Sequence, residues 1–162
     1  MNQLSQTAIE EFKTNFSGSV ILPEDKQYEE ARQIWNAMID RRPSMIACCT
    51  SPDDVVQSLN FVRRHDLPFS VRGGGHNIAG TSACDDGVMI DLSQMKRVDI
   101  DPELHLGYVE PGCNLADFDA SAQAYGLATP LGINSTTGVA GLTLGGGFGW
   151  LSRKYGMTID NL

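Results

Sequence analysis

The sequence is short of basic residues, and it has no long apolar run. It contains 12 Lys and Arg against 20 Asp and Glu, and between Val98 and Ser152 there is no Lys or Arg but there are six acidic residues. Proteins that wrap nucleic acid or lie on anionic membranes use Lys and Arg to neutralise phosphate, so neither class fits. No stretch approaches the roughly 18 consecutive apolar residues that span a bilayer. We therefore expect a small-molecule substrate as partner, no nucleic acid and no membrane.

The cysteines and histidines also lack the spacing of metal ligands. They are Cys48, Cys49, Cys84, Cys113, His65, His76 and His105. None forms a C-x-x-C or H-x-x-x-H pattern, so we predict reduced, buried thiols and no metal site. The first sixteen residues are polar and acidic and lack the apolar run and cleavage site of a secretory signal, which indicates a cytoplasmic protein.

The first half of the chain predicts a strand-helix-strand unit. From Glu24 to Asp40 apolar residues recur at spacings of three and four, which predicts an amphipathic helix closed by Pro43. Residues 44–49 then predict a buried strand, Ser51-Pro52 the start of a second helix, and residues 68–72 a second buried strand. The predicted buried face of the second helix comprises Val55, Leu59 and Val62. This unit suits a parallel pair of strands.

A meander and a third helix follow. Residues 88–92, 98–100 and 105–111 have the composition of strands separated by turns, and they are candidates for antiparallel pairing. Asn114 is expected to cap a helix that Gly126 ends in the left-handed conformation. Its predicted buried face comprises Leu115, Phe118, Ala122 and Tyr125. The whole pattern indicates an α+β fold, with a strand-helix-strand unit followed by a mixed or antiparallel sheet with flanking helices.

Sixteen of the 17 glycines lie at or after residue 73, and ten of these gather in two runs. The first run, Gly73 to Asn77, comes directly after a predicted strand. Three adjacent glycines let several main-chain N–H groups point at one anion and let a ligand approach the backbone, which favours a pyrophosphate site over a wide flexible turn. The second run has seven glycines between 132 and 149.

Two familiar nucleotide motifs do not fit these runs. A P-loop needs a lysine after its second glycine, and no glycine here is followed by lysine. The G-x-G-x-x-G motif needs glycine where Ile78 and Trp150 stand. A phosphate held by the second half of the chain therefore depends on main-chain N–H and hydroxyl groups, with Arg72 as the nearest candidate for positive charge.

Four ordered segments resemble the FAD-linked oxidase family that includes berberine bridge enzyme and bacterial sugar and alcohol oxidases. They are VRGGGHNIAG, VMIDLSQM, YVEPGCNLADF and GVAGLTLGGGFGWLSRKYG, and the similarity runs from about Trp35 to the end. The resemblance implies a PCMH-type FAD-binding fold, as in vanillyl-alcohol oxidase. Residues 1–162 would then be the N-terminal part of an FAD-binding domain, with a first subdomain at about 24–100, an incomplete second at about 101–162, and no substrate domain.

The resemblance also implies the cofactor site. The segment from Arg72 to Gly80 would hold the FAD pyrophosphate through main-chain amides, and residues 130–149 would cover the flavin and its ribityl chain. The implied cofactor-binding residues are Arg72, Gly73, Gly74, Gly75, His76, Asn77, Gly80, Pro130, Gly132, Thr136, Thr137, Gly138, Gly141, Leu142, Gly145, Gly146 and Gly149.

His76 matches the histidine to which that family links the 8α carbon of the flavin, and a neutral imidazole is a competent nucleophile near pH 7. Asn134 stands where some relatives carry a cysteine that makes a second link, so the resemblance implies a single attachment. Cys113 lies in another segment and is not expected to substitute for it. The usual catalytic base lies in a part of the family with no counterpart here, so no catalytic residue is assigned.

These features favour a piece of an FAD-dependent oxidoreductase. Its parent enzyme would take a hydride from a small alcohol, sugar or secondary metabolite and pass the electrons to O₂ or another acceptor. The piece alone is expected to be inactive, with flavin absent or partly occupied, and to form a homo-oligomer through an open sheet edge. Two alternatives stay open: a reductase of the same fold with noncovalent FAD, against which His76 argues, and a non-redox nucleotide-binding or interaction module.

Overall fold

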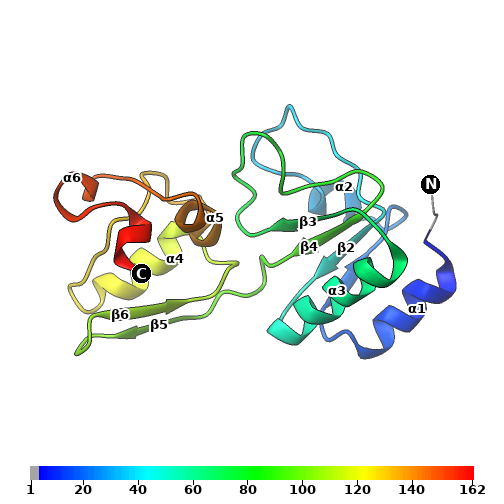
Figure 1. Ribbon diagram of the computed structural model, residues 1–162, viewed down its shortest axis with the longest axis horizontal. Coiled ribbons are helices and arrows are strands. Elements are labelled where there is room, and N and C mark those ends of the chain that lie inside the picture. The colour runs from blue at the N-terminus through cyan, green and yellow to red at the C-terminus, as the bar shows by residue number, and fades with distance from the viewer. Residues whose placement is uncertain (1–3) are drawn as a thin grey trace. The chain divides into compact units, whose positions relative to one another are not determined.

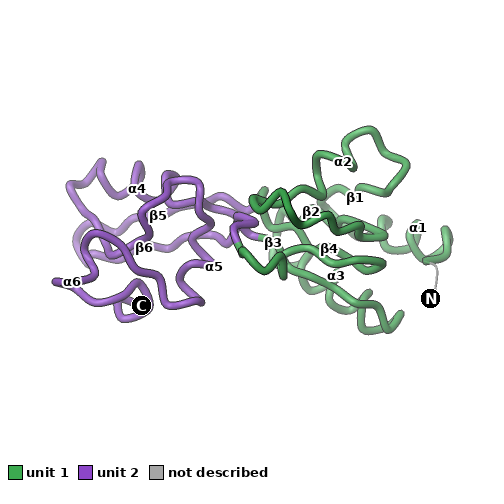
Figure 2. Tube along the Cα trace, turned by 90° about the horizontal axis from the view of Figure 1, so that it is seen from above, with its two compact units in different colours: residues 1–72, 77–94 green, residues 73–76, 95–162 purple. Residues whose placement is uncertain are grey.

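The chain divides into two compact units, shown in different colours in Figure 2. The computed structural model describes residues 4–162. Unit 1 is built from residues up to Arg72 and from Asn77–Gln94, and unit 2 from Gly73–His76 and Met95–Leu162. The short segment Gly73–His76 thus belongs by its contacts to the same unit as the second glycine run.

Unit 1 is built on a four-stranded sheet with the order β1-β2-β4-β3 (Figure 1). Strands β2, β4 and β3 are parallel, and β1 is antiparallel to β2. The elements are α1 (Gln6–Asn15), β1 (Ser19–Ile21), α2 (Tyr28–Ala31), β2 (Met45–Cys48), α3 (Pro52–His65), β3 (Phe69–Arg72) and β4 (Val88–Asp91). Helices α1 and α3 lie side by side, with the rings of Phe12 and Phe61 4.9 Å apart.

Helix α3 begins where the sequence predicts. The Ser51 hydroxyl accepts a hydrogen bond from the N–H of Asp54, Pro52 stands in the first turn, and Asp66 ends the helix in the left-handed conformation. The predicted buried face is correct only in part. Val62 is buried, whereas Val55 and Leu59 are half-buried. The remaining buried positions are Asp54, Ser58 and Phe61.

The buried side of α3 includes the carboxylate of Asp54, which hydrogen bonds hold in place. This carboxylate accepts hydrogen bonds from the N–H of Ser17 at 2.8 Å, the N–H of Thr50 at 2.9 Å and the Thr50 hydroxyl at 2.8 Å. Burial alone would raise its pKa, but these hydrogen bonds, with those from Thr50 foremost, outweigh it and lower the pKa of Asp54. A lowered pKa means that Asp54 stabilises the fold above the unfolded pKa and loses that effect as pH falls through the folded value.

Replacing Asp54 by asparagine therefore has a pH-dependent cost. Asp54→Asn is expected to lower the free energy of unfolding by about 2 kcal/mol at neutral pH, since one oxygen acceptor and the charge are lost. The difference from the wild type should shrink as pH falls from about 4 through the lowered pKa of Asp54, because the wild type then also comes to carry an uncharged side chain. Denaturant titrations from neutral to acid pH measure it, with the exposed Asp53→Asn as control. A loss of stability that does not change with pH would contradict the lowered pKa of Asp54.

The predicted strand pair is parallel, but its members are not neighbours. Strand β4 lies between β2 and β3, and Val88 pairs with both Met45 and Phe69. Both β2 and β4 are buried along their length, which confirms the prediction for residues 44–49. The predicted burial of residues 68–72 is wrong: β3 is an edge strand whose Phe69 and Val71 are 49% and 45% exposed. Residues 88–92, expected in an antiparallel meander, instead form the central parallel strand.

The predicted helix over residues 24–40 is wrong apart from one turn, α2. Tyr28 is buried, but Trp35 and Met38 are 60% and 91% exposed, so the apolar stripe is not buried along its length. The Arg72 guanidinium donates hydrogen bonds to the main-chain carbonyls of Ala31 and Gln33. In a continuing helix these carbonyls would instead accept from main-chain N–H groups four residues later. A long-range contact thus replaces the local hydrogen bonds.

Unit 2 consists of a β-hairpin packed on short helices. Its elements are β5 (Val98–Asp101), β6 (Leu106–Val109), α4 (Leu115–Gln123), α5 (Val139–Leu144), α6 (Ser152–Tyr155) and the 3₁₀ helix η1 (Thr158–Asn161). Strands β5 and β6 pair antiparallel, which confirms that part of the predicted meander. Its core comprises Cys113, Leu115, Phe118, Ala122, Leu131 and Val139. With the mixed sheet of unit 1, the fold is α+β.

Helix α4 has the predicted ends. Asn114 forms a capping box with Asp117, and Gly126 lies in the left-handed region at φ 68°. Tyr125, predicted on the buried face, is 55% exposed, because the helix ends at Gln123 and the chain turns before it. Leu106 and Tyr108 on β6 are also exposed. Self-association through a sheet edge stays a prediction.

Candidate functional site

The first glycine loop starts at a strongly held strand end. Arg72 and Asp91 are register partners on β3 and β4, and the guanidinium bonds the carboxylate through Nε to Oδ1 at 3.0 Å and Nη2 to Oδ2 at 2.8 Å. Their side chains are 13% and 4% exposed. The Arg72 side chain is thus committed to contacts inside unit 1, where it fixes the start of the loop. Its expected role toward a phosphate stays a prediction.

The two glycine runs meet within unit 2, at Gly74 and Gly138. A Cβ atom on Gly74 would lie 2.4 Å from the nitrogen and 2.5 Å from the Cα of Gly138, and a Cβ on Gly138 would lie 2.5 Å from the nitrogen of Gly74. A Cβ on Gly73 would lie 2.8 Å from the carbonyl oxygen of Pro111. These three positions therefore require glycine because main chain packs against main chain, whether or not a ligand is present.

Gly75 supplies the feature that points to an anion. It is buried and has a positive φ of 70°. Within residues 4–162, no acceptor pairs with the N–H of Gly74 or of Gly75. A buried, unpaired N–H is costly, and an anionic oxygen would satisfy it. A bound pyrophosphate needs main-chain donors of this kind, and its contact with this loop stays a prediction.

Most glycines of the second run are also required by packing. A Cβ on Gly132 would meet the Leu142 side chain at 2.4 Å, and one on Gly149 the carbonyl oxygen of Leu131 at 1.9 Å. Gly146 and Gly147 have positive φ, and the N–H groups of η1 bond their carbonyls. Pro130 is buried, and Leu142 packs on the core of unit 2.

Gly141 differs from the other six glycines between 132 and 149. It lies within α5, and nothing would come within 4 Å of its Cβ. Glycine costs about 0.5–1 kcal/mol relative to alanine inside a helix, and no contact among residues 4–162 requires it here. At Gly145 a Cβ would lie 3.3 Å from the Gly141 carbonyl oxygen, a tight contact inside the chain. The space beside Gly141 is therefore open to a bound group, as a cofactor site requires.

His76 stands beside the junction of the two runs. Its Nε2 lies 3.1 Å from the hydroxyl oxygen of Thr136. That hydroxyl donates to Oδ1 of Asn134 at 3.0 Å, and the N–H of Thr136 donates to the same oxygen at 3.2 Å. The structure thus brings His76 and Thr136 together from segments 60 residues apart in the sequence.

Asn134 was absent from the residues expected to form the site. Its signal is the Asn-x-Thr sequence, which is typical of a turn in which the asparagine side chain bonds the main chain two residues on. The N–H of Thr137 continues the turn by bonding the Asn134 carbonyl at 3.0 Å.

Asn77 and Gly80 belong to unit 1 and form a turn. The Asn77 carbonyl accepts from the N–H of Gly80 at 3.1 Å, and its Oδ1 accepts from the N–H of Thr81 at 3.2 Å. Gly80 has a φ of 76°, and the Ile39 side chain would lie 2.7 Å from a Cβ there. These contacts explain why asparagine and glycine stand at these two positions. The expected contact of Asn77 and Gly80 with a cofactor stays a prediction.

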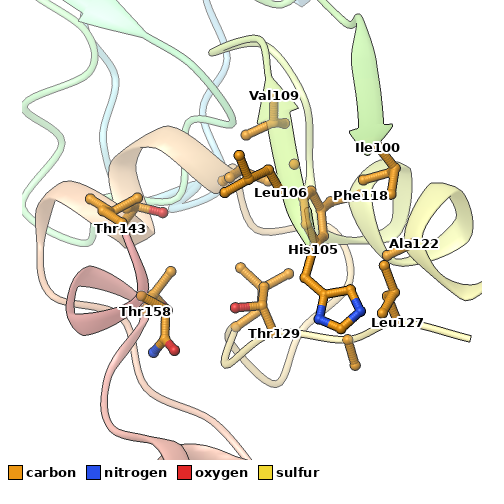
Figure 3. A pocket seen from close by; sticks show the side chains of 16 residues that line it. Ile100, His105, Leu106, Val109, Phe118, Ala122, Leu127, Thr129, Thr143 and Thr158 are labelled. Carbon is orange, nitrogen blue, oxygen red and sulfur yellow. The ribbon is translucent and has the colours of Figure 1, made fainter. Parts of the chain in front are cut away.

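A separate hollow of about 380 Å³ opens into the core of unit 2 (Figure 3). Its walls include Ile100, His105, Phe118 and Leu127, and most of the lining is apolar. The Oγ1 of Thr158, which also lines it, is buried and has no hydrogen-bond partner in the part of the chain that the structure describes. None of the residues expected to bind the cofactor lines this hollow, so sequence reasoning did not find it.

Neither a metal cluster nor a membrane helix is found in the described part of the chain. Among residues 4–162, no three His, Cys, Asp or Glu side chains gather as metal ligands. No helix in that range is both long and apolar enough to cross a bilayer. The four cysteines are unpaired. Burial raises the pKa of the Cys49 thiol to about 11, which keeps it protonated at neutral pH.

Comparison with known proteins identifies the class. The family model described as FAD binding domain matches residues 43–162, and the chain belongs to this family. It is 37% identical over 150 residues to YgaK of Bacillus subtilis, an uncharacterised FAD-linked oxidoreductase, covering 93% of this chain and 33% of that protein. It is 36% identical over 148 residues to (R)-6-hydroxynicotine oxidase of Paenarthrobacter nicotinovorans, covering 91% and 32%.

Solved structures agree with this assignment. The crystal structure of 6-hydroxy-D-nicotine oxidase from Arthrobacter nicotinovorans matches with a TM-score of 0.88 and 36% identity, over 90% of this chain and 32% of that one. The berberine-bridge-enzyme-like protein 1 of Physcomitrella patens matches with a TM-score of 0.88 and 25% identity, over 94% and 34%. The chain therefore has the PCMH-type FAD-binding fold, and it spans about a third of the length of these relatives.

Proposed function

We propose that the protein is an FAD-dependent oxidoreductase in which unit 2 holds FAD and His76 is its covalent attachment point. The observation that carries the proposal is the position of the His76 imidazole beside the contact between Gly74 and Gly138. FAD, when bound, supplies the acceptor for a hydride from the substrate. The protein supplies binding, orientation and the nucleophile.

The residues of unit 2 have distinct parts in this proposal. The N–H groups of Gly74 and Gly75 would face the pyrophosphate, and the open side of Gly141 would admit the cofactor close to the main chain. His76 would form the covalent bond. Because Asn134 stands where some relatives carry cysteine, we propose one attachment rather than two.

The relatives guide the choice of substrate class. One is named (R)-6-hydroxynicotine oxidase, another is the reticuline oxidase of Eschscholzia californica, and the grass pollen protein Phl p 4 has glucose dehydrogenase activity. We propose a small alcohol, sugar or secondary metabolite as the substrate, with O₂ or another acceptor taking the electrons. The unpaired cysteines favour a cytoplasmic location.

Acid precipitation of the complete protein tests the covalent link. We expect the yellow colour to stay in the pellet of the wild type and of a control variant, His105→Asn, and to be lost from the pellet of His76→Asn. Colour that washes out of the wild-type pellet would favour the noncovalent reductase. A purified protein without any flavin absorbance would favour the non-redox binding module.

Gly141→Ala separates a cofactor contact from a structural role. The substitution is expected to leave the free energy of unfolding unchanged or to raise it by up to about 1 kcal/mol, since it improves helix propensity in open space. It should nevertheless slow the capture of added FAD, because the methyl group occupies the space proposed for the cofactor. Thermal unfolding and flavin titration measure the two effects. A variant with unchanged FAD capture would remove Gly141 from the proposed site.

A further inference from the structure

The hydrogen bonds around Thr136 determine which nitrogen of His76 carries the proton. The main-chain N–H of Thr136 can only donate, so the Asn134 atom 3.2 Å from it must be the amide oxygen. An amide oxygen has no proton, so the Thr136 hydroxyl must donate its single proton to it at 3.0 Å. The hydroxyl oxygen then has only lone pairs to offer to His76.

It follows that the imidazole must donate in the contact of 3.1 Å between its Nε2 and the Thr136 hydroxyl oxygen. In a neutral histidine one ring nitrogen carries the proton and the other the lone pair. With the proton on Nε2, the lone pair lies on Nδ1. A hydrogen bond to a second residue thus selects the nucleophilic atom of the ring, as the hydrogen-bond partners of metal-bound histidines fix which nitrogen binds the metal.

We infer that Thr136, held by Asn134, is a positioning residue that fixes His76 as the Nε2–H tautomer and so makes Nδ1 the atom that bonds the flavin. The part of this inference that concerns the flavin rests on the proposed function. The tautomer itself is a property of this chain alone. Asn134 thereby gains a role at a position where some members of the family are expected to carry a linking cysteine.

The coupling balances with dioxygen as the oxidant. One C–H bond of the 8α methyl group and the Nε2–H bond break, and the Nδ1–C bond forms. The two electrons released pass through the flavin ring to O₂, which takes up both protons and leaves as H₂O₂. Nε2 then lacks a proton, and the Thr136 hydroxyl, which can donate as well as accept, turns its O–H toward it. A valine at 136 can do neither.

The tautomer can be measured on the cofactor-free protein. Long-range proton–nitrogen NMR spectra, recorded where His76 is neutral, distinguish the protonated nitrogen from the one that carries the lone pair. We expect Nε2–H in the wild type, and a tautomer ratio about fivefold lower in Thr136→Val, as the loss of one neutral hydrogen bond produces. Thr136→Ser should restore the ratio, Asn134→Ala should lower it, and the neighbouring Thr137→Val should leave it unchanged. A wild type with mainly Nδ1–H, or a ratio unaffected by Thr136→Val, overturns the inference.

Loading with FAD under air tests the consequence. NMR of the flavin-bearing peptide should show attachment at Nδ1, and Thr136→Val should couple about fivefold more slowly than the wild type, with Thr136→Ser close to the wild type. Attachment at Nε2 would contradict the inference. If no variant couples, the proposed covalent function fails, whereas the tautomer ratios measured without cofactor still decide the role of Thr136.

Discussion

Replacing Gly74 by alanine is expected to separate the two glycine runs and to abolish tight FAD binding. The added Cβ would lie 2.4 Å from the main-chain nitrogen of Gly138, a distance that real Cβ atoms do not show, and backbone cannot turn aside as a side chain can. The loop that carries Gly75 and His76 must move instead. Overpacking of this kind costs about 1–3 kcal/mol or more. Each 1.4 kcal/mol lost from the binding free energy weakens FAD binding about tenfold.

The matched controls use the same substitution at two other glycines. Gly141→Ala places the methyl group in open space, so it should not destabilise the protein as Gly74→Ala does. Gly138→Ala fills the same contact from the other side, so the double variant with Gly74→Ala should cost less than the sum of the two single changes. Denaturant unfolding and flavin titration give both quantities. A Gly74→Ala protein of wild-type stability would show that the two main chains do not touch.

Removing the carboxylate of Asp91 is expected to cause the largest loss of stability. Asp91→Ala leaves the Arg72 guanidinium, with a side chain only 13% exposed, without its counter-charge. Breaking a buried ion pair from one side costs about 3–5 kcal/mol. The carboxylate also accepts from the N–H of Ser93 at 3.1 Å and its hydroxyl at 2.9 Å, so these donors lose their partner as well.

An exposed ion pair of the same unit provides the comparison. Asp85 pairs with Arg41, and both side chains are more than 40% exposed, so Asp85→Ala should cost much less than Asp91→Ala. The double variant Arg72→Ala with Asp91→Ala should be more stable than the sum of the single losses predicts, since no unpaired charge is left. Equal losses for Asp91→Ala and Asp85→Ala would contradict the buried role of the pair.

Local sequence signals predicted the elements whose ends are set by neighbouring residues. Ser51 with Pro52 marks the start of α3, and Asn114 with Gly126 marks both ends of α4. The strands β2, β4, β5 and β6 follow from short apolar or alternating runs between turns. The helix ends depend on hydrogen bonds within a few residues, and the strands are marked by the apolar pattern of their own residues, both of which the sequence displays directly.

Long-range contacts decided the rest. The stripe from Glu24 to Asp40 has helical spacing, yet Arg72, about 40 residues away, takes the carbonyls of Ala31 and Gln33. The order of β4 and β3 in the sheet likewise depends on the path of residues 73–87, which has no periodic signal. The sequence therefore predicted that β3 is buried, whereas β3 forms the edge of the sheet.

The sequence pointed to the two glycine runs and His76 as the candidate site, but it did not show why most of these positions are glycine. Sequence reasoning took the glycines as places for a ligand, whereas Gly73, Gly74 and Gly138 are required by contacts between main chains. Only a structure distinguishes these from Gly141, which faces open space. The hydrogen bonds of Asn134 were not predicted, because they depend on the hydroxyl two residues later and on a histidine from a distant loop.

Peptide mapping of the flavin-containing complete protein tests the central claim most directly. After proteolysis, mass spectrometry should find the mass of the flavin on the peptide that contains His76, and on no peptide that contains Cys113 or Asn134. The same peptide from His76→Asn should carry none. Flavin bound to any other residue, or released entirely on denaturation, would contradict the account.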